Sequence, residues 1–393
     1  MQGIFSRRDF LKQTGLTALP AMLPAIRSRP MNQAAAVSES ERVFFINEGP
    51  FYRPMEYVAK LDAISKSMEI GRDSFGEGGT IDALTKKFAE ITGKEAAVYL
   101  PTGTLANQLA ISLLSGSNSK VFVQESSHVY RDEGDAAQTV FNRRLIPLAP
   151  GNHFFTVGQL MEAIAHLLEG EAFPVGVGAI SIETPVRRAD NRLVPLDEIR
   201  RISAYCRSNG YGLHLDGARL HFAAAYTNVS VREYASYFDT VYMCLYKYLG
   251  ATGGAVLCGD KTLIDRVPHL VKVHGGSIFT NWPNAAMALS HLQGIDDRLQ
   301  RTIQKSTELF GMLREISEIE ITGFTDGTNA RLLKVSPRLD LTKFKDSLRA
   351  DYITTGVPQA DGLIRMKVNE TLLLQPNARI LEAFRNAVRA ATV

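Results

Sequence analysis

The sequence has few cysteines, and their arrangement would not hold a metal ion. Its 393 residues include only Cys206, Cys244 and Cys258, and their spacing matches no zinc-ligand motif. All three stand in apolar stretches, so we expect buried free thiols rather than a disulfide framework. The chain also has no internal repeat and no apolar run long enough to cross a membrane. These absences argue against repeat proteins, small disulfide-stapled domains and membrane-spanning proteins.

The sequence also has little net charge. The total is +3 at neutral pH, and residues 1–36 hold five basic side chains against one acidic, which leaves −1 for the remainder. Binding to nucleic acid requires a basic patch, so we expect no nucleic-acid partner. The hydrophobic content of 45% and charged content of 22% are typical of a globular protein, and the length allows two domains.

The basic N-terminus resembles a twin-arginine export signal. Ser6–Lys12 contains the arginine pair, Leu16–Ile26 is moderately apolar, and Ala34–Ala36 offers a cleavage site with small residues. The alternative is an amphipathic helix with a chance arginine pair, which Pro20 and Pro24 would interrupt. We therefore expect the first 36 residues to be a signal peptide and the protein to be periplasmic, the alternative being a cytoplasmic location.

From residue 80 onward, short β-rich runs alternate with helical patterns. Strands are expected over 96–100, 121–124, 178–183, 212–216, 240–245 and 254–258, and helices over 80–92, 103–114, 157–168, 196–209 and 231–237. This alternation predicts an α/β fold whose mostly parallel sheet is covered on both faces. Sheets of this kind bind ligands beyond the carboxyl ends of their strands.

A different pattern follows the expected sheet. A long helix is expected over 284–316, and then come strands over 320–324, 332–335 and 363–368 and helices over 341–349 and 377–391. These elements predict a small α+β domain at the C-terminus. The expected organisation after the signal is an irregular arm over 37–60, a large domain over 61–300 and the small domain over 301–393.

An acid and a lysine near two strand ends indicate a particular chemistry. Asp216 closes one expected strand, and Lys247 stands in the turn after the next, ahead of Gly250–Gly254. Pyridoxal phosphate (PLP) enzymes need such a pair, because the lysine amine forms a Schiff base with the cofactor and the acid keeps the pyridine nitrogen protonated. The alternatives are a helix N-cap for Asp216 and an ordinary surface lysine for Lys247.

Other polar residues near the strand ends could complete a cofactor site. Thr102-Gly103-Thr104 stands between a strand and a helix, where free backbone N–H groups can bind phosphate, although many helices begin this way for capping alone. His128 could lie over a planar ring or transfer protons, although a lone histidine is more often a surface or core residue. Arg219 and Arg365 could each bind a carboxylate through two hydrogen bonds, although surface arginines are commoner.

Several short motifs match one enzyme family in the same order. The most specific is Pro101–Gln108. The other matching pieces are Phe75–Glu77, Thr80–Leu84, Gly93–Ala97, His128, Glu183-Thr184, Val194–Leu196, His214–Leu220, Lys247 and Arg365. Over about 300 residues the chain thus resembles the threonine aldolase / β-eliminating lyase family of PLP-dependent enzymes. The resemblance implies the three-layer α/β fold of the aspartate-aminotransferase-like enzymes (fold type I), with a small C-terminal α+β domain.

The resemblance also implies roles for single residues. The catalytic residues would be Lys247, His128 and Asp216, with His128 stacked on the ring of PLP. Arg219 and Arg365 would bind the substrate carboxylate, no metal would take part, and the chain would form a homodimer or homotetramer. The cofactor-binding residues would be Thr102, Gly103, Thr104, His128, Glu183, Asp216, Arg219 and Lys247.

The function implied is that of an aldehyde-lyase that cleaves threonine or a related 3-hydroxy amino acid to glycine and an aldehyde. Another PLP-dependent reaction on an amino acid (β-elimination, transamination or racemisation) is the alternative, and a non-catalytic binding protein is a third hypothesis. A binding protein would need neither Lys247 nor Asp216, which argues against the third.

Four departures from the family pattern concern the substrate rather than the cofactor. Tyr246 precedes the lysine where many members have serine, and the stretch around Glu171–Phe173 lacks the family's second histidine. His274–Trp282 replaces a glycine-rich segment with an arginine, and Asn47–Pro50 differs from the usual start, where a serine helps to bind the carboxylate. The sequence therefore indicates the cofactor more firmly than the substrate.

Overall fold

The structure is a computed structural model that describes residues 41–392. The expected export signal, residues 1–36, lies outside the described residues. Within 41–392, no helix has both the length and the hydropathy that crossing a membrane requires.

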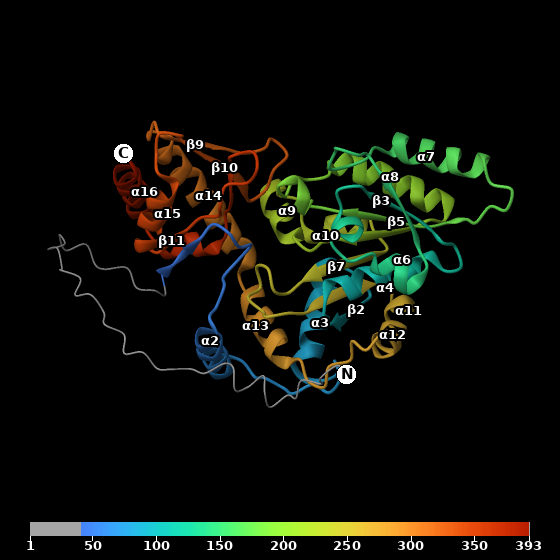
Figure 1. Cartoon of the computed structure of the whole chain (residues 1–393). Coiled ribbons are helices and arrows are strands. Elements are labelled where there is room, and N and C mark those ends of the chain that lie inside the picture. The colour runs from blue at the N-terminus through green and yellow to red at the C-terminus, as the bar shows by residue number, and fades with distance from the viewer. Residues whose placement is uncertain (1–40, 393) are drawn as a thin grey trace, which may run out of the picture. The chain divides into compact units, whose positions relative to one another are not determined.

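Seven strands form the main sheet, in the spatial order β2-β8-β7-β6-β5-β3-β4 (Figure 1). The five strands from β7 to β4 in this order are parallel, and β8 is antiparallel to both β7 and β2. The expected mostly parallel sheet is therefore confirmed. The strands are β2 (Ala96–Leu100), β3 (Lys120–Gln124), β4 (Arg144–Leu148), β5 (Val177–Glu183), β6 (Gly212–Asp216), β7 (Thr240–Cys244) and β8 (Ala255–Gly259).

Helices cover both faces of this sheet, as the alternation of buried side chains along β7 demonstrates. Val241 and Met243 belong to the core on one face, whereas Tyr242 and Cys244 belong to the core on the other. Successive side chains of a strand point to opposite faces, so a strand buried on both sides has a continuous apolar sequence. The helices of this region are α3 (Gly79–Thr92), α4 (Gly103–Ser115), α5 (His128–Arg131), α6 (Ala136–Phe141), α7 (Val157–Glu169), α8 (Leu196–Asn209), α9 (Leu220–Thr227), α10 (Val231–Ser236), α11 (Lys261–Ile264) and α12 (Val267–Val273).

The C-terminal part has its own apolar core and a three-stranded antiparallel sheet in the order β12-β10-β9. The N-terminal arm joins this part, because β1 (Val43–Phe44) pairs in parallel with β11 (Ile353–Thr354). The other elements are α2 (Pro54–Ser67), the short helix η2 (Arg187–Ala189), α13 (Trp282–Leu292), α14 (Ile295–Leu313), β9 (Ile319–Thr322), β10 (Ala330–Val335), α15 (Leu341–Ala350), β12 (Ile364–Lys367), η3 (Glu370–Leu374) and α16 (Asn377–Ala391).

Three of the differences between the expected and the observed elements have a clear physical reason. The strand β4 was not expected because it contains Pro147, but it is an edge strand, where proline is tolerated. The long helix expected over 284–316 is two helices, since Gly294 adopts a left-handed conformation (φ 63°) between α13 and α14. The arm is not irregular throughout, because Pro54 occupies the first turn of α2, a position that suits proline.

Candidate active site

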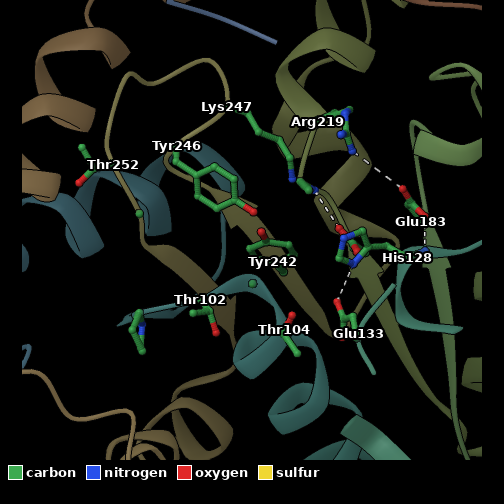
Figure 2. Close-up of a pocket in the computed structure, with 15 residues that line it drawn as sticks. Thr102, Thr104, His128, Glu133, Glu183, Arg219, Tyr242, Tyr246, Lys247 and Thr252 are labelled. Carbon is green, nitrogen blue, oxygen red and sulfur yellow. Dashed lines mark hydrogen bonds and ion pairs between the residues drawn. The ribbon is translucent and has the colours of Figure 1, made fainter. Parts of the chain in front are cut away.

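A cavity of about 450 Å³ lies where β5, β6 and β7 end and α4 begins (Figure 2). This is the expected place for a ligand in a parallel sheet. Most of the residues expected from the sequence line it. The lining consists of Pro101, Thr102, Gly103, Thr104, His128, Glu133, Glu183, Asp216, Ala218, Arg219, Tyr242, Tyr246, Lys247, Thr252 and Gly253.

Asp216 is one of three buried acids that line this cavity. One carboxylate oxygen accepts a hydrogen bond from the backbone N–H of Ala218 (3.1 Å), and the other accepts from Nδ2 of Asn107 (3.0 Å). Asp216 is not the N-cap of the next helix, because α9 begins only at Leu220. Its carboxylate is therefore held at the end of β6 by two donors and faces the cavity.

Asn107, which the sequence analysis did not single out, connects the polar groups beneath the cavity. Its Nδ2 donates to Asp216 and to Oε1 of Glu133 (2.8 Å), and its Oδ1 lies 3.0 Å from Nε2 of His214. Burial lowers the pKa of His214 to about 4, so the ring is neutral and carries one proton. That proton belongs on Nε2, because Oδ1 of Asn107 can only accept, and Nδ1 can then accept from the hydroxyl of Thr240 (2.8 Å).

Glu133, also missed, is the partner of His128. Nδ1 of His128 lies 2.9 Å from Oε1 of Glu133, and the backbone N–H of His128 donates to Glu183 (2.7 Å). The hydrogen bond with Glu133 raises the pKa of His128, and burial raises the pKa of Glu133. A glutamate in the turn after an expected catalytic histidine, and an asparagine inside the apolar stretch Leu105–Ile111, were the available sequence signals.

Lys247 reaches the cavity from the turn after β7. The turn is closed by backbone hydrogen bonds from Ala251 to Leu245 and from Leu245 to Gly254. The ammonium group lies 5.3 Å from the centre of the Tyr246 ring, and within residues 41–392 it has neither a hydrogen bond nor an ion pair. The end of this half-buried side chain is therefore left for a ligand that enters the cavity.

The N-terminus of α4 offers an anion site on the other side of the cavity. Thr102 is the N-cap and accepts from the N–H of Leu105 (3.2 Å), which leaves the N–H groups at Gly103 and Thr104 at the cavity wall. A Cβ atom on Gly103 would lie 2.1 Å from the hydroxyl of Tyr242. Glycine is therefore required there, because it lets the first turn of α4 approach β7.

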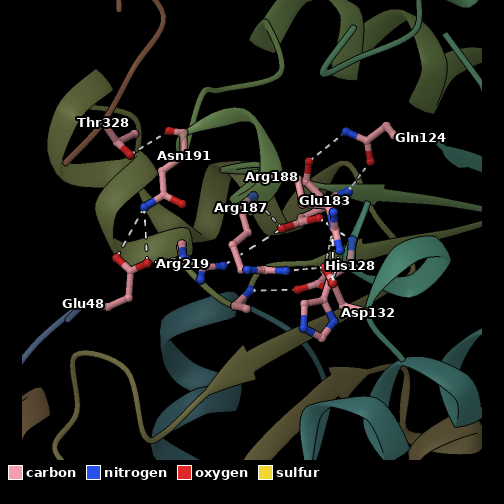
Figure 3. A network of polar contacts seen from close by, with 12 residues as sticks. Glu48, Gln124, His128, Asp132, Glu183, Arg187, Arg188, Asn191, Arg219 and Thr328 are labelled. Carbon is pink, nitrogen blue, oxygen red and sulfur yellow. Dashed lines mark hydrogen bonds and ion pairs between the residues drawn. The ribbon is translucent and has the colours of Figure 1, made fainter. Parts of the chain in front are cut away.

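Glu183 and Arg219 form the wall opposite α4. Glu183 accepts from the N–H groups of His128 and Arg187 (2.8 Å), and burial raises its pKa to about 7. Arg219 is buried, with Nη1 4.0 Å from Glu183 and Nε 2.8 Å from Glu48 of the arm. The polar network thus extends from His128 to the N-terminal arm (Figure 3).

Arg365 does not line this cavity. Its guanidinium on β12 pairs with Asp190 (3.1 Å) and with Asp361 (2.8 Å). The structure therefore brings together Thr102, Gly103, Thr104, His128, Glu183, Asp216, Arg219 and Lys247, but not Arg365. A role for Arg365 in binding the substrate stays a prediction without a contact to support it.

The departures from the family pattern lie in different places. Tyr246 lines the cavity, whereas Glu171 pairs with Lys120 at the other end of β3. The replaced segment 274–282 is tied to Asp73, which accepts from the N–H groups of Asn281 (2.7 Å) and Trp282 (2.9 Å). Of these departures, only Tyr246 faces the cavity directly.

The groups that line the cavity suit a ligand with three particular features. An anion fits the N-terminus of α4, a protonated ring nitrogen fits Asp216, and an aldehyde can react with Lys247. The ligand atoms of His128, Glu133 and Asp216 also lie within 4.8 Å of one another. Glu133 and Asp216 both accept from Nδ2 of Asn107, and His128 pairs directly with Glu133, so these hydrogen bonds account for the closeness.

Comparison with solved structures identifies the class of fold. The structure aligns with one from Exiguobacterium sp. 255-15, provisionally named an aromatic amino acid beta-eliminating lyase/threonine aldolase, with a TM-score of 0.75 and 21% identity over 90% of this chain and 98% of that one. The threonine aldolase of Leishmania major aligns with a TM-score of 0.69 and 17% identity over 88% and 99%. The fold is that of the α/β fold-type-I PLP enzymes, as expected.

The family follows from the sequence. Residues 58–335 match the model of the beta-eliminating lyase family, so the chain belongs to this family of PLP-dependent enzymes. A low-specificity L-threonine aldolase of Candida albicans is 34% identical over 56% of this chain and 58% of its own length. The alanine racemase TOXG of Cochliobolus carbonum is 32% identical over 56% and 55%. These matches span little more than half the length of either relative.

The pairing of His128 with Glu133 gives a testable prediction. In Glu133→Gln, the imidazolium loses its carboxylate partner while burial still disfavours its charge, so the pKa of His128 should fall. Histidine-labelled protein titrated by NMR measures this pKa. The matched change at exposed Glu162 should leave it unaltered, and an unaltered value in Glu133→Gln would contradict the pairing.

Proposed function

We propose that this chain is a PLP-dependent aldehyde-lyase that cleaves threonine or a related 3-hydroxy amino acid to glycine and an aldehyde. The observation that carries the proposal is that Asp216, Lys247 and the N-terminus of α4 line one cavity of about 450 Å³. These are the groups that a pyridine nitrogen, an aldehyde and a phosphate require. When bound, PLP supplies an electron sink for the pair of electrons released from a breaking bond.

Different residues of the cavity would bind different parts of the cofactor. Lys247 would hold the cofactor covalently and give it up to the amino group of the substrate. Asp216, fixed by Asn107 and Ala218, would keep the ring nitrogen protonated. The free N–H groups at Gly103 and Thr104 would bind the phosphate.

His128 is the candidate base for the 3-hydroxyl of the substrate. With Nδ1 donating to Glu133, Nε2 is the ring atom left to accept a proton. The carboxylate of Glu133 stabilises the imidazolium that forms, in agreement with the raised pKa of His128. Arg219 would bind the carboxylate of the substrate and so fix which bond lies perpendicular to the ring.

The name of one relative suggests racemisation as a second function to test. The Cochliobolus carbonum protein, at 32% identity, is named an alanine racemase, and a racemase and an aldehyde-lyase can share one cofactor site. Tyr246 at the cavity wall is the residue whose contact with the substrate could differ between the two reactions.

Lys247→Ala tests the cofactor assignment. The wild-type protein incubated with PLP should show the visible absorption band of a lysine-bound cofactor. The variant should lose this band because Lys247 is the only lysine of residues 41–392 that lines the cavity. The same change at exposed Lys87 should leave the band in place. A band that survives in Lys247→Ala, or none in the wild type, would reject the assignment.

A product screen over 3-hydroxy amino acids tests the reaction. The proposal expects glycine together with the corresponding aldehyde, detected by chromatography and by trapping of the carbonyl. Formation of a keto acid, or exchange of the α-hydrogen with inversion and no aldehyde, would instead identify one of the other PLP-dependent reactions.

We also propose export by the twin-arginine route, supported by the motif Ser6–Lys12. A reporter fused to the first 36 residues should reach the periplasm. Replacing Arg7 and Arg8 together with lysine should retain the reporter in the cytoplasm, which cell fractionation measures. A fusion that stays in the cytoplasm with both arginines intact would refute export.

We further propose a homodimer or homotetramer. Large apolar side chains on and beside α2 support it, because Phe51, Met55 and Val58 are 63%, 77% and 57% exposed. Exposed apolar side chains that lie close together are typical of surfaces that bind another protein.

A further inference from the structure

The N-terminal arm places a buried carboxylate, Glu48, beside the cavity. Its Oε1 accepts from Nε of Arg219 (2.8 Å) and from Nζ of Lys367 (2.7 Å), and its Oε2 accepts from Nδ2 of Asn329 (2.9 Å). Figure 3 shows this contact between the arm and Arg219. Although burial alone would raise the pKa of Glu48, the charges of Arg219 and Lys367 hold it well below its ordinary value. Glu48 is therefore a permanent anion shared by two cations.

The backbone of the arm is fixed on both sides of Glu48. The carbonyl of Phe45 accepts from the N–H of Lys367 (2.6 Å), and the carbonyl of Asn47 accepts from Nδ2 of Asn369 (2.8 Å). On the other side, a Cβ atom on Gly49 would lie 2.4 Å from the carbonyl oxygen of Lys247. The arm thus packs directly against the turn of the reactive lysine, and the carboxylate of Glu48 is preorganised.

The hydrogen bond between Nε of Arg219 and Glu48 holds one edge of the guanidinium. Glu48 does not line the cavity but binds Nε, whereas Arg219 itself lines the cavity. Within the described chain, Nη1 and Nη2 have no hydrogen bond, and Nη1 lies 4.0 Å from the carboxylate of Glu183. The two Nη groups are therefore the ones left for a ligand, and two adjacent N–H donors match the two oxygens of a carboxylate.

The charge balance favours an incoming anion. Arg219 and Lys367 together carry two positive charges against the single negative charge of Glu48. Two further acids lie near Arg219. Burial raises the pKa of Glu183 to about 7, so its charge is partly suppressed near neutral pH, and Asp216 is the acid expected to pair with the ring nitrogen of the cofactor. The cluster of Arg219, Lys367 and Glu48 thus presents a net positive charge to a ligand carboxylate even though Arg219 already has a partner.

We propose that Glu48 is a positioning residue that determines the specificity of this cavity for substrates with an α-carboxylate, because it holds Arg219 by Nε and directs Nη1 and Nη2 towards the substrate. The inference rests on the proposed function, since it takes an amino acid as the substrate. The N-terminal arm would then help to recognise the substrate, in addition to the residues that bind the cofactor.

Two ligands that differ only in the recognised group test the proposal. Glycine and 2-aminoethanol both offer an amine to the PLP-loaded protein, but only glycine has a carboxylate. Each is titrated into PLP-loaded protein while the visible absorption of the cofactor is followed. The wild type should prefer glycine, and Glu48→Gln should weaken glycine binding by about tenfold or more while the dissociation constant of 2-aminoethanol stays within about twofold.

Two further variants make the result specific. Glu56→Gln is the matched control, because Glu56 belongs to the same N-terminal region but pairs with Arg42 and Arg53 near the surface. It should behave as the wild type. Should Glu48→Gln fail to fold because Lys367 is left without a partner, the double variant Glu48→Gln/Lys367→Met removes one charge of each sign and should show the same selective loss.

The outcomes separate this inference from the proposed function. A Glu48→Gln protein that binds both ligands as the wild type does, or loses both equally, would overturn the positioning role. Tighter glycine binding would overturn it too, because Glu48 would then be competing with the substrate for Arg219. If the wild type takes up no PLP, the proposed function itself fails and the inference fails with it.

Discussion

Three buried carboxylates converge on one cavity, and the rest of the site is arranged around that constraint. Glu133, Glu183 and Asp216 are each at most 8% exposed, and like charges at close range raise one another's pKa. Burial and the neighbouring Asp216 raise the pKa of both glutamates. Each carboxylate is fixed by its own pair of nitrogen partners. Asn107 and Ala218 bind Asp216, the backbone N–H groups of His128 and Arg187 bind Glu183, and Asn107 and the ring of His128 bind Glu133.

Asn107 is central to this arrangement because a neutral amide can serve two carboxylates at once. A charged donor there would be a buried cation, and an aspartate would add a fourth negative charge to the cluster. The two carboxylates set the orientation of the amide because they accept from Nδ2, and Oδ1 is then left to accept from Nε2 of His214, which burial keeps neutral. The positions of Asp216 and His128 therefore depend on groups that never contact a ligand.

Much of the fold could be predicted from the sequence because its local signals were strong. The helix over 196–209 and the strands over 96–100 and 212–216 have the expected bounds, since apolar periodicity and flanking glycines agree there. The strand β4 was missed because its proline suits only an edge, and edge position is a property of the whole sheet. The break at Gly294 was missed because glycine is tolerated inside helices often enough to be ambiguous.

The residues expected to bind the cofactor were easier to predict from the sequence than the residues beneath and beside them. Asp216 and Lys247 stand at strand ends, where sequence position alone indicates the edge of the sheet. Glu133 and Asn107 act through other side chains, so their roles depend on distances that the sequence does not contain. For the same reason, the ion pairs of β12 could not be predicted from the sequence. Arg365 pairs with Asp190, whereas Lys367, two residues later, pairs with Glu48.

The two halves of the site come from different parts of the chain, and this bears on specificity. The cofactor-facing groups belong to the seven-stranded sheet and to α4, whereas Glu48, Asn329 and Lys367 come from the arm and the C-terminal antiparallel sheet. A change in the arm can therefore alter how Arg219 meets a substrate without altering Asp216 or the N-terminus of α4. This separation agrees with a departure from the family pattern at Asn47–Pro50 and its retention at Pro101–Gln108. In our proposal, the groups of the sheet and α4 supply the chemistry, and the segments packed beside them select the substrate.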